Sequence, residues 1–195
     1  MTVVALLRHG PTKWTDSHRL QGRRDLPLSA AGRAAVKGWR LPQRVMAYRR
    51  VTSPLKRALE TAELLGGRAA QIEPRLIEMD WGRWQGETLD ALRVKLGDDM
   101  AENEARGLDF RPEGGESPRE VLARLAPWFE ELGHAGEPVL AVTHKGVIQA
   151  VMARATGWDM TSKPPARTRW GVLHMFEVDR AGGLRMTEPV PMVSP

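Results

Sequence analysis

Strand-like and helix-like stretches alternate along the chain, and this alternation constrains the fold more than any other feature of the sequence. Apolar runs typical of buried strands occur at residues 2–7, 45–53, 69–73 and 139–144. Segments of helical character separate these runs, and residues 171–190 are typical of a terminal hairpin. Strands that alternate with helices form βαβ units. We therefore predict an α/β three-layer sandwich, with a mainly parallel sheet, helices on both faces and a C-terminal antiparallel hairpin.

Several of the predicted helices begin with a recognisable start signal. Ser29 is a good N-cap for the alanine-rich segment that follows it, and Pro54 favours the first turn of the next helix. Ser117 and Glu120 nearly match a capping box, which predicts a helix that runs to about residue 132. The helix behind the strand at 139–144 follows directly, without a loop.

The length of the chain suits one domain, which we expect to span residues 1–195. Glycine and tryptophan interrupt any periodicity over residues 74–86, which predicts a long ordered loop. A helical, acidic segment is expected at 87–106. The region at about 74–117 is thus predicted to form a cap of loop and helix on the domain.

The composition narrows the classes of function. Hydrophobic residues make up 42% and charged residues 27% of the chain, and the absence of cysteine excludes disulfides and thiolate chemistry. The net charge is +5, but the basic residues are scattered, so we expect anionic small molecules as ligands and no nucleic acid. No apolar run approaches the roughly 20 residues of a membrane span, and we expect a cytoplasmic protein without a membrane partner. The oligomeric state is left open, with a homodimer as one alternative.

Basic and imidazole side chains follow two of the buried strands directly. Arg8 and His9 come after the first strand, and His144 ends the strand at 139–144. The carboxyl ends of parallel strands meet at one edge of the sheet, where ligands bind. Arg57 lies one turn into a helix that follows another strand, so its guanidinium can reach the same edge. Two arginines at one edge can hold a phosphoryl group by bidentate hydrogen bonds.

A carboxylic acid for proton transfer is also present. Glu78 lies among tryptophans in the predicted loop and is a candidate general acid, with Asp80 as its rival. Further donors around an anion are expected from Thr12, Gln21 and Gly22. Additional charge is expected from Arg19 and Arg23, whereas structural positions are expected for His18, His134 and His174.

Taken together, these blocks resemble the histidine phosphatase superfamily, the phosphoglycerate mutase-like proteins. The stretch "RHGPTKWTDSHRLQGRRDLPLSAAGR" resembles the Arg-His-Gly opening of the family with its later Gln-Gly and Asp-x-Pro-Leu-Ser/Thr-x-x-Gly. "SPLKRALETA" matches Ser-x-x-x-Arg-Ala-x-x-Thr-Ala, and "LIEMDWGRWQG" matches Glu-x-x-x-Gly-x-Trp-x-Gly. "RPEGGES" and "VLAVTHKG" match the last two blocks. The matches run in family order from residue 3 to about 150.

The resemblance implies a mechanism and roles for these residues. His9 is implied as the nucleophile that becomes phosphohistidine, and Glu78 as the acid that protonates the leaving oxygen. Arg8, Arg57 and His144 are implied to neutralise the charge of the transferring phosphoryl group. No metal and no cofactor are required, because arginine and histidine supply the charge. The implied substrate-binding residues are Thr12, Gln21, Gly22, Thr143 and Lys145.

Three positions depart from the family pattern. Pro11 stands where many relatives have glutamate or alanine, Thr15 where many have asparagine, and Lys145 where glycine commonly follows the second histidine. Lys145 either adds a cation near the phosphate or only occupies the start of a helix. These differences leave the substrate open among a sugar phosphate, a phosphoglycerate and a nucleotide-like phosphate.

Several functions compete on these residues. The first is hydrolysis of a small phosphomonoester, and the second is phosphoryl transfer of the cofactor-dependent phosphoglycerate mutase type. A metal-dependent hydrolase and a noncatalytic phosphate-binding module are the remaining alternatives. A mutase must shield its phosphohistidine from water. Only 65 residues separate Glu78 from His144, and the tail after the hairpin is short, so we expect a phosphatase.

Overall fold

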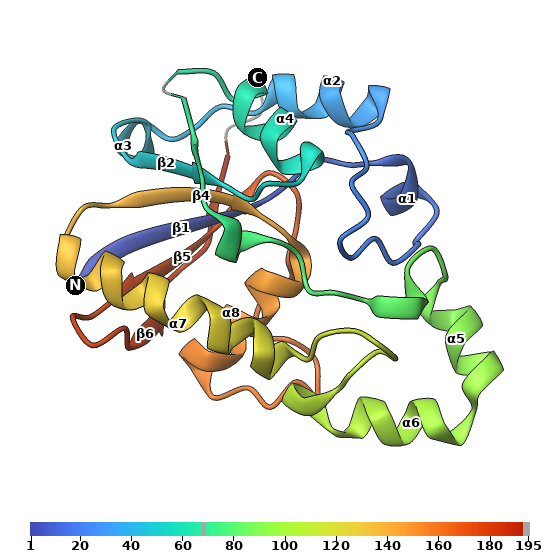
Figure 1. The fold of residues 1–195 in the computed structure, drawn as a ribbon. Helices are drawn as coiled ribbons and strands as arrows, with labels where there is room; N and C mark the ends of the chain where they lie inside the picture. The colour runs from blue at the N-terminus through green and yellow to red at the C-terminus, as the bar shows by residue number, and fades with distance from the viewer. Residues whose placement is uncertain (68, 193–195) are drawn as a thin grey trace.

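A seven-stranded sheet forms the centre of the computed structural model, which describes residues 1–67 and 69–192 (Figure 1). The strands are β1 (Thr2–Arg8), β2 (Arg49–Thr52), β3 (Gln71–Ile72), β4 (Val139–Thr143), β5 (Val172–Val178), β6 (Leu184–Met186) and β7 (Val190–Pro191). Their order is β3-β2-β4-β1-β5-β6, and β7 pairs with β5. The first four strands in this order run parallel, whereas β5, β6 and β7 pair antiparallel. The predicted mainly parallel sheet with a C-terminal antiparallel hairpin is confirmed.

Helices cover both faces of the sheet. The helices are α1 (Lys13–Asp16), α2 (Ala30–Gly38), α3 (Gln43–Met46), α4 (Lys56–Leu64), α5 (Leu89–Leu96), α6 (Asp98–Ala105), α7 (Pro118–Ala135) and α8 (Lys145–Thr156). Figure 1 shows α7 and α8 on one side of the strands and α2 and α4 on the other. None of the helices in the described ranges is long and apolar enough to cross a membrane.

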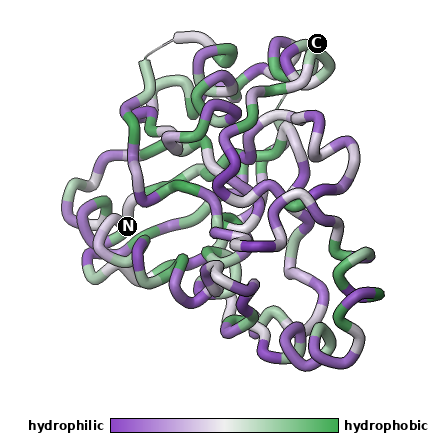
Figure 2. The backbone as a smooth tube through the Cα atoms, turned by 45° about the vertical axis from the view of Figure 1, so that its right-hand side comes forward, coloured by the Kyte–Doolittle hydropathy of each residue, from purple (hydrophilic) through white to green (hydrophobic). Residues whose placement is uncertain are grey.

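The burial of β1 explains why both faces must be covered. Val4 and Leu6 pack into the core on the α7–α8 side, whereas Ala5 and Leu7 pack into the core on the α4 side. Successive side chains of a strand point to opposite faces, so an unbroken apolar run requires cover on each. Figure 2 shows hydrophobic residues along the strands through the middle of the molecule. Burying each large side chain contributes about 1.5–3 kcal/mol, so β1 anchors both cores.

The segment between the sheet and α7 carries a small core of its own. It contains three short 3-10 helices, η1 (Pro74–Leu76), η2 (Gly82–Trp84) and η3 (Gly107–Asp109), besides α5 and α6. Trp84, Leu92 and Met100 are buried together there. The expected single helical segment is broken at Gly97, whose positive φ of +53° favours glycine and ends α5.

Local start signals were predicted better than the boundaries of the second strand. The Ser29 hydroxyl accepts from the Gly32 N–H, and Ser117 forms the predicted capping box. The strand expected over 45–53 is shorter, because α3 occupies its first residues. One turn of helix already buries Val45 and leaves the next side chain exposed, which imitates the alternation of a strand.

Candidate active site

Two histidines lie side by side where the two central strands end. β1 and β4 are neighbours, with Arg8 opposite Thr143 in the register. The backbone N–H of His9 donates to the Thr143 carbonyl at 2.9 Å, which continues the ladder past the strand ends. The ring centroids of His9 and His144 are consequently 5.1 Å apart, and both rings are buried. The prediction that these histidines meet at one sheet edge is confirmed.

The imidazole of His9 is held in one tautomer. Its Nδ1 lies 2.7 Å from the Gly10 carbonyl oxygen, which can only accept, so Nδ1 carries the proton. The Nε2 atom therefore keeps its lone pair. Burial, followed by the charges of Arg57 and Arg8, holds the pKa of His9 well below its ordinary value. His9 is thus a neutral imidazole with a free nucleophilic nitrogen at neutral pH.

Gly10 allows the chain to turn away immediately after His9. Its N–H donates to the Thr61 hydroxyl at 3.0 Å, and that hydroxyl donates to the Arg57 carbonyl at 2.6 Å. A Cβ at position 10 would lie 2.4 Å from Cγ2 of Val36. Only glycine fits between the end of β1 and α2, and the two hydrogen bonds tie this turn to α4.

Ser53 orients the ring of His144. The Ser53 hydroxyl lies 2.7 Å from Nε2 of His144 and accepts from the Leu55 N–H at 3.4 Å. A hydroxyl carries one proton and two lone pairs, so this contact orients the ring of His144 in either tautomer. The buried Nδ1 of His144 has no hydrogen-bond partner among the described residues. Burial, with Arg57 as the next cause, holds the pKa of His144 well below its ordinary value.

Two arginines provide the fixed positive charge. Arg57 is fully buried and donates to the carbonyls of Gly22 and Arg24, both at 2.7 Å. The guanidinium of Arg8 lies 4.3 Å from the ring centroid of Trp170. Burial lowers the pKa of each arginine to about 10, so both stay charged at neutral pH. In each guanidinium the buried Nε lacks a protein partner within the described part of the chain.

Glu78 faces these cations from the opposite wall. It is buried, and its carboxylate accepts from the Met79 N–H at 2.9 Å and from the Gly146 N–H at 3.3 Å. A Cβ on Gly146 would lie 2.6 Å from Oε1 of Glu78. The carboxylate therefore sits against the first turn of α8. Asp80 instead pairs with Arg23 at 3.7 Å, so Glu78 is the acid that reaches the cavity.

The loop that carries Glu78 is held on several sides. The Thr143 hydroxyl donates to the Leu76 carbonyl at 2.9 Å, and Arg124 donates to the Ile77 carbonyl at 2.7 Å. Glu116, from the Gly-Glu-Ser block, accepts from Arg124 at 2.9 Å. Thr143 is absent from the lining of the cavity, so its hydroxyl holds the loop rather than a ligand.

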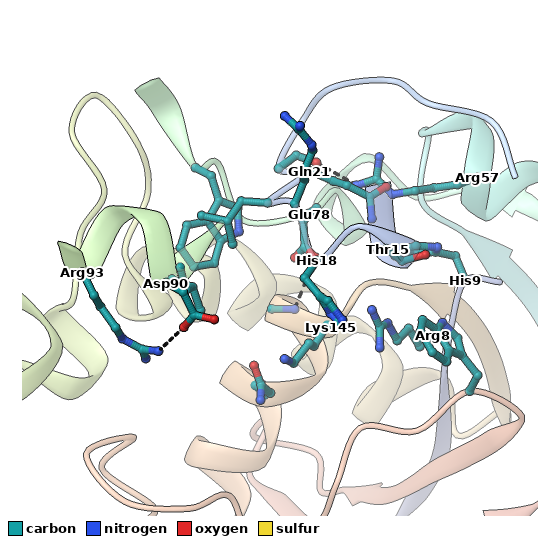
Figure 3. A pocket seen from close by; sticks show the side chains of 18 residues that line it. Arg8, His9, Thr15, His18, Gln21, Arg57, Glu78, Asp90, Arg93 and Lys145 are labelled. Carbon is teal, nitrogen blue, oxygen red and sulfur yellow. Dashed lines mark hydrogen bonds and ion pairs between the residues drawn. The ribbon is translucent and has the colours of Figure 1, made fainter. Parts of the chain in front are cut away.

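His9, Arg8, Arg57 and Glu78 line one cavity of about 460 Å³, whereas His144, predicted as a member of the site, is not part of its lining (Figure 3). Its walls include His9, Arg8, Arg57, Glu78, Gln21, Gly22 and Lys145 from the predicted set. Thr12 is not in the wall, because its hydroxyl donates to Oε1 of Gln21 at 3.0 Å and orients that amide. The carbonyl of Gly22 holds Arg57, which gives this glycine an indirect place in the site.

The outer wall of the cavity comes from two segments that are joined to each other. The Leu20 N–H donates to the Glu87 carbonyl, and the Gly86 N–H donates to the Leu20 carbonyl, both at 2.8 Å. Arg19 adds a bond to the Gly86 carbonyl at 2.8 Å. Arg93 of α5 completes this wall and pairs with Asp90 at 3.2 Å.

Several lining residues escaped prediction from the sequence, among them His18 and Trp170. His18, expected to hold a structural loop position, lines the cavity with a φ of +56°. Trp170 comes from the loop before β5 and is 40% exposed. His18 lies inside the first sequence block, at a position to which the resemblance assigns no role. Trp170 lies outside the blocks, 162 positions from the Arg8 that it contacts. No group of three or more potential metal ligands occurs within residues 1–67 and 69–192.

Comparison with known proteins decides the family. The profile of the Histidine phosphatase superfamily (branch 1) matches residues 4–183. The chain belongs to this superfamily. The resemblance found in the sequence blocks is therefore confirmed, and the match extends past His144 into the terminal hairpin.

Individual histidine phosphatase relatives include both hydrolases and mutases. The chain is 36% identical to a glucosyl-3-phosphoglycerate phosphatase of Mycolicibacterium vanbaalenii over 83% of this chain and 77% of the relative. It is 30% identical to a 2,3-bisphosphoglycerate-dependent phosphoglycerate mutase of Methylobacterium radiotolerans, over 91% of this chain and 90% of the relative. The solved structure of a mycobacterial glucosyl-3-phosphoglycerate phosphatase in complex with VO3 superposes with a TM-score of 0.75 at 25% identity. The superposition covers 96% of this chain and 98% of the other.

Proposed function

We propose that this chain hydrolyses a small phosphomonoester through a phosphohistidine on His9, without a metal. The observation that carries the proposal is the fixed tautomer of His9. Its Nδ1 proton is bound to the Gly10 carbonyl, so Nε2 stands free in a cavity lined by Arg8 and Arg57. A neutral imidazole nitrogen among cations is suited to attack phosphorus and unsuited to hold a metal cation.

In the first step, the Nε2 lone pair of His9 attacks phosphorus as the bond to the leaving oxygen breaks. Glu78 gives its proton to that oxygen, and the leaving group departs as an alcohol. Arg8 and Arg57 bind the equatorial oxygens, where the loose transition state spreads its charge. Nδ1 of His144, which has no partner among the described residues, supplies a further donor when it carries the ring proton. These donors are held in place by the protein before the reaction, so little reorganisation is needed.

In the second step, the carboxylate of Glu78 takes a proton from water, and the water oxygen attacks phosphorus. The P–N bond breaks, its electron pair returns to Nε2 of His9, and inorganic phosphate leaves. Glu78 is again protonated and ready for the next cycle. Water can enter because several lining side chains, such as His18 and Lys145, are exposed.

The chain after Trp170 supports hydrolysis over phosphoryl transfer. β5, β6 and β7 return this tail to the sheet edge, and its residues up to Met192 contribute nothing to the lining of the cavity. A mutase needs a cover over its phosphohistidine. The described tail provides none, so water should reach the intermediate.

Phosphate release from p-nitrophenyl phosphate and from a panel of phosphorylated metabolites tests the proposal. His9→Ala should lower turnover by at least about 10³-fold and abolish an acid-labile phosphate in quenched enzyme. His134→Ala changes an exposed histidine whose Nδ1 bonds the Glu130 carbonyl, outside the cavity lining, and should keep full activity. EDTA should leave turnover unchanged.

Each competing function predicts a different result. Formation of 2-phosphoglycerate from 3-phosphoglycerate and catalytic 2,3-bisphosphoglycerate, with negligible phosphate release from any monoester, would identify a mutase. Loss of activity in EDTA would indicate a metal enzyme. Binding of phosphate without turnover of any substrate would indicate a noncatalytic module.

A further inference from the structure

A second cavity, of about 360 Å³, adjoins the catalytic cavity. The residues that line both cavities are Trp81, Leu89, Arg93, Gly146 and Gln149. Figure 3 shows Arg93 at the opposite end of the catalytic cavity from His9. The second cavity therefore extends the site in the direction that leads away from the proposed nucleophile.

The wall of the second cavity is mainly apolar. Its lining includes Met79, Phe110, Pro118 and Met160 in addition to the shared Trp81. The rings of Trp81 and Phe110 meet edge to face, with their centroids 5.7 Å apart. Trp81, Phe110 and Met160 are only partly buried, so apolar surface is left open to solvent in a concave place. Such a surface beside an active site is suited to bind the apolar part of a ligand.

The charges in this wall are already balanced. Among the described residues, its charged side chains are Arg93 and Glu104, which pair at 2.7 Å. Arg93 also pairs with Asp90 at 3.2 Å. Neither side chain is left over for an anionic group of a ligand, so the second cavity favours an uncharged occupant. The catalytic cavity differs in this respect, because it holds the guanidinium groups of Arg8 and Arg57.

The loop that carries Met160 is held rigidly against the cap. The Asp159 carboxylate accepts from the N–H and from the hydroxyl of Thr161, both at 2.9 Å. A Cβ on Gly107 of η3 would lie 2.1 Å from the Asp159 carbonyl oxygen, so the loop and η3 are in close contact. Between these two anchored residues, Met160 has a φ of +67°, which is unfavourable for a residue with a long side chain. Strained residues of this kind cluster at ligand sites, and Met160 lines the second cavity.

The two cavities meet beside the group that is proposed to contact the leaving oxygen. The consecutive residues Glu78 and Met79 line the catalytic and the second cavity, respectively. A Cβ on Gly146 would lie 2.6 Å from Oε1 of Glu78 and 3.3 Å from Cβ of Met79, so this glycine is in contact with both. A leaving group that extends past Gly146 thus reaches the second cavity.

We propose that the second cavity binds an apolar part of the leaving group, so that the preferred substrates are phosphomonoesters of extended hydrophobic alcohols. The phosphoryl group would occupy the cationic cavity at His9, and the hydrophobic tail would pack between Trp81, Phe110 and Met160. This inference rests on the proposed function, because it assumes that the phosphoryl group is bound at His9.

A series of alkyl phosphates that differ only in chain length provides the test. Ethyl, butyl and hexyl phosphate have leaving alcohols of nearly equal acidity, so their kcat/KM values differ mainly through binding of the tail. Each methylene that enters an apolar cavity should raise kcat/KM by about 3- to 4-fold. Because the first carbons remain in the catalytic cavity, we expect hexyl phosphate to exceed ethyl phosphate by at least about 10-fold.

Met160→Asn should lower this ratio of hexyl to ethyl phosphate by about 3- to 10-fold, since a polar amide replaces an apolar side chain in the wall. Asparagine adopts a positive φ more readily than methionine, so thermal unfolding should show no loss of stability. The matched control is Met46→Asn, which changes an exposed methionine on α3 outside both cavities and should leave the ratio unchanged.

Binding separates this inference from the proposed function. Calorimetric titration of ethylphosphonate and hexylphosphonate into the wild type and into Met160→Asn compares the two tails without turnover, because the P–C bond is not hydrolysed. Tighter binding of hexylphosphonate that Met160→Asn weakens supports the apolar site, even if no phosphomonoester is hydrolysed. Equal kcat/KM values for ethyl and hexyl phosphate in an active enzyme would overturn the inference and leave the proposed function intact. A preference for the longer tail that Met160→Asn does not change would overturn it as well.

Discussion

Gly146→Ala tests whether the position of the Glu78 carboxylate controls turnover. The added Cβ would lie 2.6 Å from Oε1 of Glu78 and 3.3 Å from Cβ of Met79. Carbon and oxygen atoms in ordinary contact are roughly 3.5 Å apart, so the carboxylate must move by roughly 0.9 Å. The movement also weakens the hydrogen bond that Oε2 accepts from the N–H of residue 146.

A misplacement of about 1 Å can cost a catalytic group about 10²-fold in rate. We therefore expect kcat/KM for alkyl phosphates to fall by about 100-fold in Gly146→Ala. p-Nitrophenyl phosphate should lose less than about 5-fold, because its leaving group needs little protonation. The fold should not suffer, since Gly146 lies in the first turn of α8 outside the left-handed region, and alanine favours a helix over glycine by about 0.5–1 kcal/mol.

The assay compares both classes of substrate in the wild type, Gly146→Ala and the matched control Gly38→Ala. A Cβ at Gly38, the last residue of α2, meets nothing within 4 Å. Thermal unfolding of each variant excludes a loss of folded protein. Combining Gly146→Ala with Glu78→Gln should add little to the loss from Glu78→Gln alone. Full activity of Gly146→Ala on alkyl phosphates would refute the assignment of Glu78 as the acid.

Three further predictions concern residues around the site. Ser53→Ala removes the partner of His144 Nε2, so kcat in a steady-state assay should fall by about 10-fold, and the free energy of unfolding should fall by about 1–3 kcal/mol because a buried nitrogen is left unpaired. Trp170→Leu removes the ring beneath Arg8 and should raise the KM for phosphomonoesters by about 3- to 10-fold, whereas Trp170→Phe should keep most of the affinity. His174 is buried with neither ring nitrogen bonded among the described residues, and burial lowers its pKa to about 4. Below the unfolded pKa of about 6.5, His174 is protonated in the unfolded chain but stays neutral in the folded chain. The free energy of unfolding therefore decreases as the pH falls, by about 2 kcal/mol between pH 7 and 5. Urea titrations should show that His174→Leu loses about 2 kcal/mol less than the wild type over this interval, and equal losses would contradict the reasoning.

The residues of the inner site could be predicted because local sequence and sheet topology both determine their positions. His9 and His144 each follow a buried strand directly, and parallel pairing brings such strand ends together. Arg57 is equally constrained, since it lies in the first turn of the helix that follows β2. In each case the side chain lies close in sequence to a regular element.

The outer wall could not be predicted in the same way, because its contacts depend on how irregular segments pack. Trp170 contacts Arg8 from a loop whose path depends on tertiary packing and not on local sequence. Thr12 was expected to contact the ligand, yet its hydroxyl is used by the amide of Gln21. Hydrogen-bond competition of this kind has no signature in sequence spacing.

The ladder bond from His9 to Thr143 has a consequence for motion in the site. It fastens the nucleophile to the two most protected strands, so the His9 amide should exchange with deuterium only when the sheet itself opens. The inner wall of the cavity is therefore rigid, and any closure on a substrate must come from movement of the outer wall. There, the backbone bonds between Leu20 and residues 86–87 join the segment after α1 to the segment before α5. Because these hydrogen bonds join the two segments, we expect them to move together as one rigid unit.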